Sequence, residues 1–501
     1  MAKGLTAGKP LSSGGKGWAL SFAKNQLSQS LLPASGCPLH YWQQKNRYYY
    51  EDLERLLRFF LPPGLRILEI GCGTGALLNA LRPSFGVGID QDAEVIAQAQ
   101  QQFPHLHFRL QDLQRLDKRD PVLAQPFDAI LLVNTLSYLG DIQQVLEQLR
   151  CFCTRRTRLI LSHHNPLWEP LLNLATLLRQ RRPLPAANWL SAADVANLLH
   201  LAGYEVIQQG KRLLLPRRIP LLSTLVNRVI APLPGINALC LTEYTIARLQ
   251  PDPNWDPPPE KQPSCTVIIP ARNEAGNIRR CVEQLPEMGS RTEILFVEGH
   301  SSDDTWAEIQ RVQAEYQGIR PIQALRQEGK GKGDAVRQGF AAARGDVVII
   351  LDADLTVQAE DLPKFFRAVA SGRCDFANGC RLIYPLKPEA MPRLNQWANR
   401  FFAALLSYIL GIRVKDTLCG TKALWREDYW QIAKLRQEWG NFDPFGDFDL
   451  LLGAAKRTLK ILDIPVRYFP RTYGRSNIHH LRDGLRLLQI CGFALKHFKG
   501  S

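Results

Sequence analysis

The stretch "GDVVIILDADLT", residues 345–356, joins an apolar run directly to two carboxylates, Asp352 and Asp354. A short run of β-branched and aliphatic residues, Val347–Leu351, predicts a buried strand. An uncompensated buried carboxylate costs several kcal/mol, so two acids at the end of such a strand need a reason to be there. We therefore expect a ligand, rather than protein interior, beyond this strand end.

Similar strand ends flank this stretch. "CTVIIPARNEAGNI" (265–278) and "TEILFVEGHSSDDTW" (292–306) each predict a strand, a polar turn and the start of a helix. "QEGKGKGDAVRQGF" (327–340) is a Gly/Lys loop before a helix, and no P-loop motif fits it. Its cationic backbone still suits a diphosphate. Alternating strands and helices predict an α/β fold with a mainly parallel sheet.

The chain of 501 residues is too long for one core, so two or three domains are expected. "PDPNWDPPPEKQP" (251–263) holds six prolines and predicts a stiff extended linker. We therefore expect one domain over 45–250 and a second over 264–501. Residues 1–44 contain no acid and many Gly, Ser and Lys residues, which favours a flexible tail over a transit peptide.

The composition is that of globular protein, with 45% apolar and 22% charged residues. A net charge of +15 predicts anionic partners (nucleic acid, a phospholipid surface or phosphorylated small molecules) unless it serves solubility alone. Eleven scattered cysteines without a CxxC pair indicate reduced thiols in a cytosolic protein. No apolar run reaches about 18 residues, so no transmembrane helix is expected.

The first half opens on "LRILEIGCGTGALLNAL" (65–81), which predicts a strand, a glycine turn and a helix. Its glycines allow close backbone approach to a ligand and leave amide groups free at a helix start. Polar residues end or follow the neighbouring predicted strands as well. The candidate set is Glu69, Gly71, Gly73, Gly75, Asp90, Asp112, Leu113 and Asn134.

These segments resemble the class I S-adenosylmethionine-dependent methyltransferases over about residues 45–250, with a dinucleotide dehydrogenase as the alternative. The resemblance implies a Rossmann-like fold in which Glu69 and the three glycines hold the methionine part of the cofactor. It also implies that Asp90 binds the ribose and that Asp112 and Leu113 flank the adenine. Asn134, on the fourth predicted strand, completes the cofactor-binding set.

The methyl acceptor is not predicted. The element Asn-Pro-Pro-Tyr or Asp-Pro-Pro-Tyr, usual in adenine amino methyltransferases, is absent after the fourth strand. In "SHHNPLWEP" (162–170), His163 or His164 could act as a general base or be structural. Methyl transfer can also proceed by positioning alone. RNA methylation ranks lower because no aromatic and basic platform stands out, and we do not expect nucleic acid as a partner.

The second half resembles the family 2 glycosyltransferases over about residues 264–480, near the dolichol- or polyprenyl-phosphate sugar synthases. "IIPARNEAGNI", "FVEGHSSDDT", "GKGDAVRQGF", "LDADL", "DTLCGTKAL" and "RTYGRSNI" carry the resemblance. It implies a GT-A nucleotide-diphospho-sugar transferase fold. The implied donor-binding residues are Pro270, Arg272, Glu274, Glu298, Lys332, Asp352, Arg381, Lys422 and Arg471.

Within that resemblance, Asp354 and Asp352 form the metal-binding motif for Mg²⁺ or Mn²⁺, with Asp354 the stronger metal candidate and Asp352 the stronger sugar-nucleotide candidate. Glu298 meets the base. The family's Asp-Asp-Gly-Ser is Glu298-Gly299-His300-Ser301 here, which leaves the base-binding acid and the donor open.

The expected reaction is inverting, because the acceptor attacks opposite the leaving diphosphate. A metal at Asp354 stabilises the charge that develops there. In "NFDPFGDFDLLLGAAK" (441–456), Asp447 or Asp449 is the candidate catalytic base; the alternatives are helix capping and orienting the acceptor. A lipid phosphate acceptor needs no base.

We expect a bifunctional enzyme that acts on a lipid-linked or envelope glycan, from a nucleotide-sugar donor. The alternative is a glycosyltransferase with a non-catalytic S-adenosylmethionine-binding domain that regulates or scaffolds it. Two apolar segments with basic residues, 396–412 and 481–501, either lie on an anionic membrane surface or pack on the core. The expected location is cytoplasmic, peripheral at the inner face of the membrane in the first case.

Overall fold

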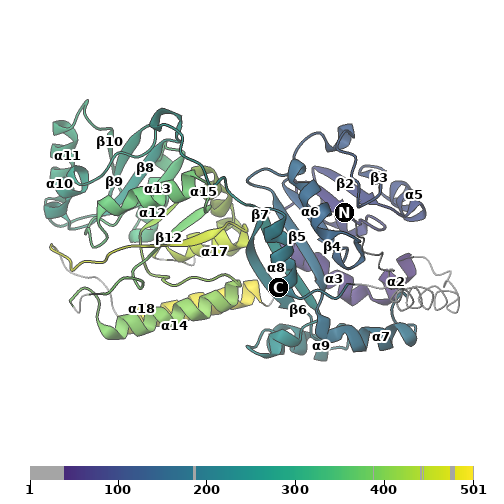
Figure 1. Ribbon diagram of the computed structural model, residues 1–501. Helices are drawn as coiled ribbons and strands as arrows, with labels where there is room; N and C mark the ends of the chain where they lie inside the picture. Colours follow the sequence, from purple (N-terminus) through teal and green to yellow (C-terminus); the bar gives the residue numbers. More distant parts are fainter. Residues whose placement is uncertain are drawn as a thin grey trace, which may run out of the picture.

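Two α/β domains stand side by side in a computed structural model of the chain (Figure 1). The structure describes residues 39–183, 188–386, 389–440, 443, 445–473 and 480–499. Most of the predicted tail therefore lies outside the described residues. Its last part, from residue 39, belongs to helix α2 (Leu39–Lys45).

The first domain is built on a seven-stranded sheet with the order β3-β2-β1-β4-β5-β7-β6. Strands β1 to β5 are parallel, and β7 runs antiparallel to both β5 and β6. The predicted Rossmann-like fold is confirmed, with a mixed edge that no local pattern indicated. The strands are β1 Arg66–Ile70, β2 Phe85–Asp90, β3 His107–Leu110, β4 Ala129–Val133, β5 Arg158–His164, β6 Tyr204–Arg212 and β7 Thr242–Leu249.

Short polar side chains cap the N-termini of several helices of this domain. Asp92 accepts hydrogen bonds from backbone amides of α5, and Asp141 accepts one from α6. Ser191 and Asp194 form a capping box at α8. The helices are α3 Arg47–Phe60, α4 Ala76–Ala80, α5 Ala93–Gln102, α6 Ile142–Leu149, α7 Glu169–Leu177, α8 Ala192–Leu201 and α9 Leu222–Leu225, and α9 runs on into the π-helix η5 Val226–Ile230.

The second domain also has a seven-stranded sheet, in the order β10-β9-β8-β11-β13-β12-β14. Strands β8 to β11 are parallel, whereas β13 is antiparallel to β11 and β12. The predicted GT-A architecture is confirmed. The strands are β8 Cys265–Ala271, β9 Thr292–Glu298, β10 Ile322–Arg326, β11 Val347–Ile350, β12 Phe376–Cys380, β13 Lys422–Trp425 and β14 Ile461–Pro465.

Its helices cover both faces of this sheet and extend along one edge of the molecule (Figure 1). They are α10 Ala275–Glu283, α11 Thr305–Glu315, α12 Lys332–Ala342, α13 Leu362–Ala370, α14 Arg393–Leu410, α15 Arg426–Lys434, α16 Arg436–Trp439, α17 Phe448–Lys456 and α18 His480–Phe498. Among the described residues, no helix combines the length and apolar character needed to cross a membrane.

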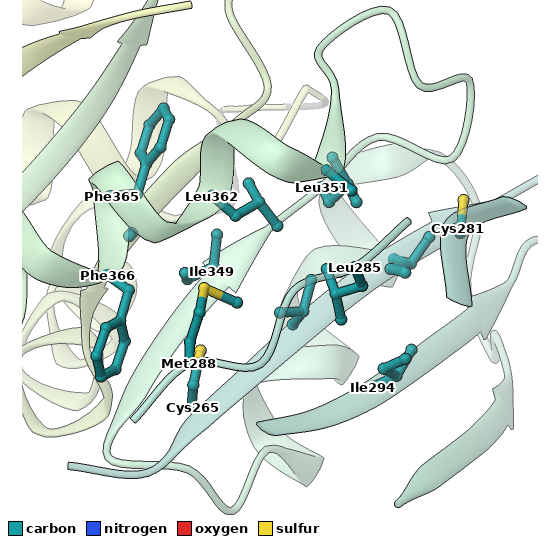
Figure 2. Close-up of a cluster of buried hydrophobic side chains, with 14 of the residues drawn as sticks. Cys265, Cys281, Leu285, Met288, Ile294, Ile349, Leu351, Leu362, Phe365 and Phe366 are labelled. Atoms are coloured by element: carbon teal, nitrogen blue, oxygen red, sulfur yellow. The ribbon is translucent and has the colours of Figure 1, made fainter. Parts of the chain in front are cut away.

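Strand β11 fills the centre of this domain, as its apolar run predicts. Val347, Ile349 and Leu351 belong to one buried cluster, and Val348 and Ile350 to the cluster on the other face. Figure 2 shows Ile349 and Leu351 in the first cluster, together with Cys281 of α10 and Phe365 of α13. A strand that is buried on both faces can carry polar ligands only at its end, and Asp352 and Asp354 follow there.

A buried ionic network joins the two domains. Asp375 of the second domain pairs with Arg158 (Nη2–Oδ2, 2.8 Å) and Arg248 (Nη1–Oδ1, 2.6 Å) of the first. Burial opposes the charge on Asp375, but the two guanidinium groups hold its pKa below the ordinary value. Gln208 adds an interdomain hydrogen bond to the carbonyl of Leu410 (2.6 Å). Because breaking a buried ion pair costs about 3–5 kcal/mol, this network fixes one domain against the other.

Candidate functional sites

The glycine turn after β1 has the backbone that its sequence predicts. Gly71, Gly73 and Gly75 have φ angles of 74°, 53° and 73°, in the left-handed region that favours glycine. A Cβ at Gly71 would lie 2.5 Å from Oγ1 of Thr135, and one at Gly75 would lie 2.5 Å from the ring of Phe108. The turn is therefore built for glycine, and it leads into helix α4.

Two carboxylates stand beside this turn without a cationic partner in the described part of the chain. Glu69 is buried at the end of β1, and its Oε2 atom has no hydrogen-bond partner. Burial, and then the charge of Asp90, raises the pKa of Glu69 to about 8. Asp90 accepts hydrogen bonds from the amides of Gly73 (2.9 Å) and Asp92 (3.1 Å). A buried orphan carboxylate fits a ligand with a positive group, such as the ammonium of S-adenosylmethionine.

The remaining cofactor candidates lie at the ends of neighbouring strands. Asp112 follows β3, and its side chain accepts a hydrogen bond from the backbone amide of Gln114 (2.9 Å) in the next turn. The adjacent Leu113 is buried. Asn134 follows β4 with φ 57°, and its Oδ1 accepts from the hydroxyl of Tyr49 (2.9 Å). The carboxyl ends of β1 to β4 thus carry all the predicted residues of this site on one edge of the sheet.

The two histidines at the end of β5 have different environments. His163 is buried, and its Nε2 atom lies 3.2 Å from Oε2 of Glu243, which also pairs with Lys211. This environment fits a structural role for His163 rather than that of a general base. His164 stacks on the ring of Tyr49, with centroids 5.6 Å apart. Burial, followed by the charges of Arg181 and His163, lowers the pKa of His164 to about 3. His164 is therefore uncharged at neutral pH and a weak base.

Sequence reasoning missed Tyr49, which contacts both Asn134 and His164. It lies on α3, upstream of the sheet, in the run Tyr48-Tyr49-Tyr50. The amphipathic pattern of this helix predicts which face is buried, but no motif connects it to strand ends about 85 and 115 residues later.

In the second domain, Asp352 forms an ion pair with Lys332 at the start of α12 (Nζ–Oδ1, 2.6 Å). Burial disfavours both charges, but their mutual attraction lowers the pKa of Asp352 and raises the pKa of Lys332. A Cβ at Gly420 would lie 2.2 Å from Oδ2 of Asp352 and 2.3 Å from Nζ of Lys332. Gly420, which sequence reasoning did not single out, therefore gives this pair its space.

Asp354 belongs to a second ionic group. Arg471 bridges Oδ2 of Asp354 (Nη2, 2.6 Å) and Oε1 of Glu274 (Nη1, 3.0 Å). Oδ1 of Asp354 accepts from the amide and hydroxyl of Thr356 (3.0 and 2.8 Å). Burial is the main reason that the pKa of Glu274 is raised. The two acids of the predicted metal motif thus contact different cations.

The described residues contain no cluster of three His, Cys, Asp or Glu side chains placed to hold a metal ion. An Mg²⁺ or Mn²⁺ ion at Asp354 would therefore draw most of its ligands from substrate phosphates and water. Mg²⁺ commonly binds proteins in this way, through one or two carboxylates. The carboxylate chemistry of Asp354 fits such an ion.

The other donor-binding candidates gather around the same sheet edge. Pro270 and Arg272 lie at the end of β8, and Glu298 ends β9 with Oε1 accepting from the amide of Ser301 (2.5 Å). Arg381 binds Asp416 through Nε (2.8 Å) and Nη2 (2.9 Å). Lys422 is enclosed and donates to Oδ1 of Asn378 (3.2 Å). Contact of Arg381 and Lys422 with substrate phosphates stays a prediction.

Three acids at or just before the start of α17 have different partners in the structure. Asp443 caps the helix, because its Oδ2 accepts from the amides of Phe448 (2.7 Å) and Asp449 (2.9 Å). Asp449 pairs with Arg436 (Nε–Oδ2, 2.6 Å). Asp447 lies 3.4 Å from Nζ of Lys422, on the side of the Lys332–Asp352 pair. Of the two candidate bases, Asp447 is the one next to the donor-binding residues.

Comparison with known protein families agrees with this division of the chain. A family model described as "Glycosyl transferase family 2" matches residues 266–433, and one described as "Methyltransferase domain" matches residues 41–209. The two matches include strands β1 to β5 of the first sheet and β9 to β13 of the second, whereas β7 and β14 lie outside them.

Three curated relatives each match less than half of this chain. A dolichyl-phosphate hexose transferase of Haloferax volcanii is 35% identical over 208 residues, which is 41% of this chain and 82% of that protein. The low-salt glycan biosynthesis hexosyltransferase Agl6 of the same organism is 31% identical over 229 residues, 45% of this chain and 52% of that protein. A dolichol-phosphate mannosyltransferase of Pyrococcus furiosus is 35% identical over 220 residues, 42% of this chain and 58% of that protein. The chain thus spans about half the length of Agl6.

Proposed function

Because the chain belongs to the family 2 glycosyltransferases and also carries an S-adenosylmethionine-dependent methyltransferase domain, we propose that it is a bifunctional enzyme. It transfers a methyl group from S-adenosylmethionine and a sugar from a nucleotide-sugar to a lipid-linked or envelope-glycan acceptor. One observation carries this proposal: each domain gathers its predicted polar residues at the carboxyl ends of its parallel strands. The methyltransferase domain covers residues 45–250 and the glycosyltransferase domain residues 264–501, with the linker 251–263 between them.

In the glycosyltransferase domain, cationic side chains are already in place for an anionic donor. Lys332 and Arg471 flank Asp352 and Asp354, and both cations are held by acids rather than left to move in solvent. They bind and orient the diphosphate of a nucleotide-sugar. A divalent ion held by Asp354 supplies further positive charge where the leaving diphosphate becomes more negative.

The acceptor is inferred from chemistry that the curated relatives share. Two of them are named for transfer to dolichyl or dolichol phosphate. A lipid phosphate is already anionic and needs no base, whereas a hydroxyl acceptor would use Asp447. Helices α14 and α18 expose Trp397, Phe401 and Leu485, which suits a peripheral position on the cytoplasmic face of a membrane.

In the methyltransferase domain, Glu69 and the glycine turn bind the charged methionine part of the cofactor, and Asp90 binds its ribose. When bound, the cofactor supplies an activated methyl group on a sulfonium. Since His164 is a weak base and His163 is buried beside Glu243, positioning of the acceptor rather than strong base catalysis drives the transfer.

A second function for this domain has one observation in its favour. The low pKa of His164 makes it a weak base, and His163 is buried beside Glu243. A domain that binds S-adenosylmethionine without turnover, and so regulates or scaffolds the glycosyltransferase, would have the same features.

The test is a ligand screen on the full chain. UDP- and GDP-sugars with Mg²⁺ or Mn²⁺ are expected to raise the melting temperature for at least one donor, and the absence of any shift would contradict the glycosyltransferase proposal. Isothermal titration with S-adenosylmethionine is expected to show one site. Binding without methyl transfer to any lipid-linked glycan would favour the second function, and no binding would exclude both roles of the methyltransferase domain.

A further inference from the structure

Exposed apolar side chains are concentrated on two segments of the methyltransferase domain. Helix α7 and its flanks form one segment, and residues 219–239, which include α9 and η5, form the other. Within both α7 and η5, no residue is buried. The exposed members are Leu167, Leu171, Leu174, Leu177, Leu178, Ile219, Leu221, Leu222, Leu225, Val229, Leu233 and Leu239. A helix on a protein surface normally buries its apolar side, and large exposed apolar patches mark interaction sites.

The two segments form one surface, because hydrogen bonds tie them together at both ends. Nε1 of Trp168 donates to the carbonyl of Leu239 (2.7 Å) at one end. Nη2 of Arg217 donates to Oε1 of Gln180 (2.7 Å) at the other end. Trp168 and Leu172 also pack against the buried cluster of Tyr49, Leu213 and Leu241, which anchors the surface to the domain. We call this the α7–α9 surface.

The charge around the α7–α9 surface is mostly positive. Residues 170–193 and 206–242 contain Arg and Lys but no Asp or Glu, and Glu169 begins α7. Arg218 and Arg228 line a cavity of about 510 Å³ between α3 and α9, whose α3 side carries Glu51, Glu54 and Arg55, and no ion pair of Arg218 or Arg228 with an acid is found among the described residues. Apolar side chains surrounded by unpaired arginines complement a bilayer with anionic headgroups, which attract such residues by about 1 kcal/mol each.

The surface also continues toward the glycosyltransferase domain. In Figure 1, α7 and α9 lie along the same lower edge of the molecule as α14 and α18. Phe498 and Lys499, at the end of α18, line a cleft together with Arg228 and Pro232 of the α7–α9 surface. Leu394 and Trp397 on α14 are each 70% exposed. The two domains thus present apolar and cationic residues on one edge.

We propose that the α7–α9 surface binds an anionic phospholipid bilayer, so that the methyltransferase domain has a membrane contact of its own. Its leucines enter the boundary between headgroups and acyl chains, and its arginines contact lipid phosphates. Pairing of two copies through this surface would bring two mostly positive faces together. The inference goes beyond the proposed activities and needs neither of them, since binding is measured without turnover.

Flotation of the full chain with vesicles tests the proposal. Vesicles of phosphatidylcholine mixed with phosphatidylglycerol are expected to carry the chain, and phosphatidylcholine alone far less. The double substitution Leu221→Asp and Leu225→Asp is expected to weaken binding at least about tenfold, because both leucines leave the apolar phase. The matched control is Ile319→Asp, at an exposed isoleucine between α11 and β10, toward the opposite edge in Figure 1, and it should bind like the unmodified chain.

A second measurement separates this surface from α14 and α18. An environment-sensitive fluorophore on Leu225→Cys, in a Cys151→Ser background, is expected to shift to the blue when anionic vesicles are added; on Ile319→Cys it should not. No shift at position 225, unchanged flotation of the double variant, or equal binding to neutral vesicles would overturn the proposal. So would a dimer that Leu221→Asp and Leu225→Asp dissociate while vesicle binding stays intact.

Discussion

The two candidate sites lie at equivalent edges of two sheets, but the acids of the two sites differ in whether they contact a cation. In the methyltransferase domain, Glu69 and Asp90 face no cation in the described part of the chain, and burial raises the pKa of Glu69. In the glycosyltransferase domain, Asp352 and Asp354 each contact a cation. Under the proposed function, this difference matches the charge of each ligand. The acids of the first site would receive a positively charged ligand, and the cations of the second would receive an anionic one.

The largest expected effect comes from removing the acid that would bind a metal. Asp354→Asn should lower nucleotide-sugar turnover by roughly a hundredfold to a thousandfold, because charge on the leaving diphosphate loses its stabilisation. Turnover with Mn²⁺ is the measurement. The exposed Glu360→Gln, a few residues further on, is the control and should leave turnover unchanged. Wild-type turnover in Asp354→Asn would remove the metal role.

The next expected effect distinguishes Asp447 from Asp449, the two acids at the start of α17. With a hydroxyl acceptor, Asp447→Asn should lower kcat by about a hundredfold and remove the acidic limb of the pH profile. Asp449→Asn should instead destabilise the fold by about 1–3 kcal/mol, because Arg436 loses its partner. Equal kcat values for the two variants would contradict the assignment of Asp447 as the base.

A smaller effect tests the preplaced cation. Lys332→Met should weaken binding of a nucleotide-sugar about tenfold, whereas binding of S-adenosylmethionine should not change. Isothermal titration measures both ligands on one sample. Lys330→Met is the control, because Lys330 lies in the same loop but is exposed and forms no ion pair with any described residue. If both lysine variants lose the same affinity for the nucleotide-sugar, the loop acts through its overall charge, and a specific role of Lys332 is contradicted.

The smallest effect concerns the free acid of the first site. The pKa of Glu69 is about 8 in the folded chain and near 4.5 when exposed, so the folded state holds the extra proton between these values. Stability without ligand therefore falls as the pH rises from about 4.5 to about 8. Glu69→Gln should be more stable than the unmodified chain at about pH 9, by about 1–3 kcal/mol, and equally stable near pH 4.

The same variant should bind S-adenosylmethionine about tenfold more weakly, because its amide cannot neutralise the ammonium group. Thermal unfolding across pH and isothermal titration are the two readouts. Glu94→Gln, exposed on α5, should alter neither. A pH profile that is identical for Glu69→Gln and the unmodified chain would show that Glu69 is ionised in the folded state.

The α7–α9 surface, which we propose binds a membrane, could not be predicted from sequence patterns. The apolar residues of α7 look like those of any core-facing helix, and only the fold shows that the helix buries none of them. Segments 396–412 and 481–501 can be identified from the sequence, because basic segments there carry apolar residues at helical spacing. Residues 219–239 lack such a spacing, since a short helix, a π-helix and a turn succeed one another there.

The sequence by itself determined the strand ends, the glycine turn and the acids at the ends of β1 and β2 and after β11, because each depends on a few adjacent residues. Only the tertiary structure decided the partners of those acids. Arg471 meets Asp354 across 117 positions, and Arg158 meets Asp375 across 217. It also decided that Asp443, rather than Asp447 or Asp449, caps α17, and that β7 and β13 run antiparallel. Local preference follows from neighbouring residues, whereas the pairing of distant charges follows from how the sheets bring their edges together.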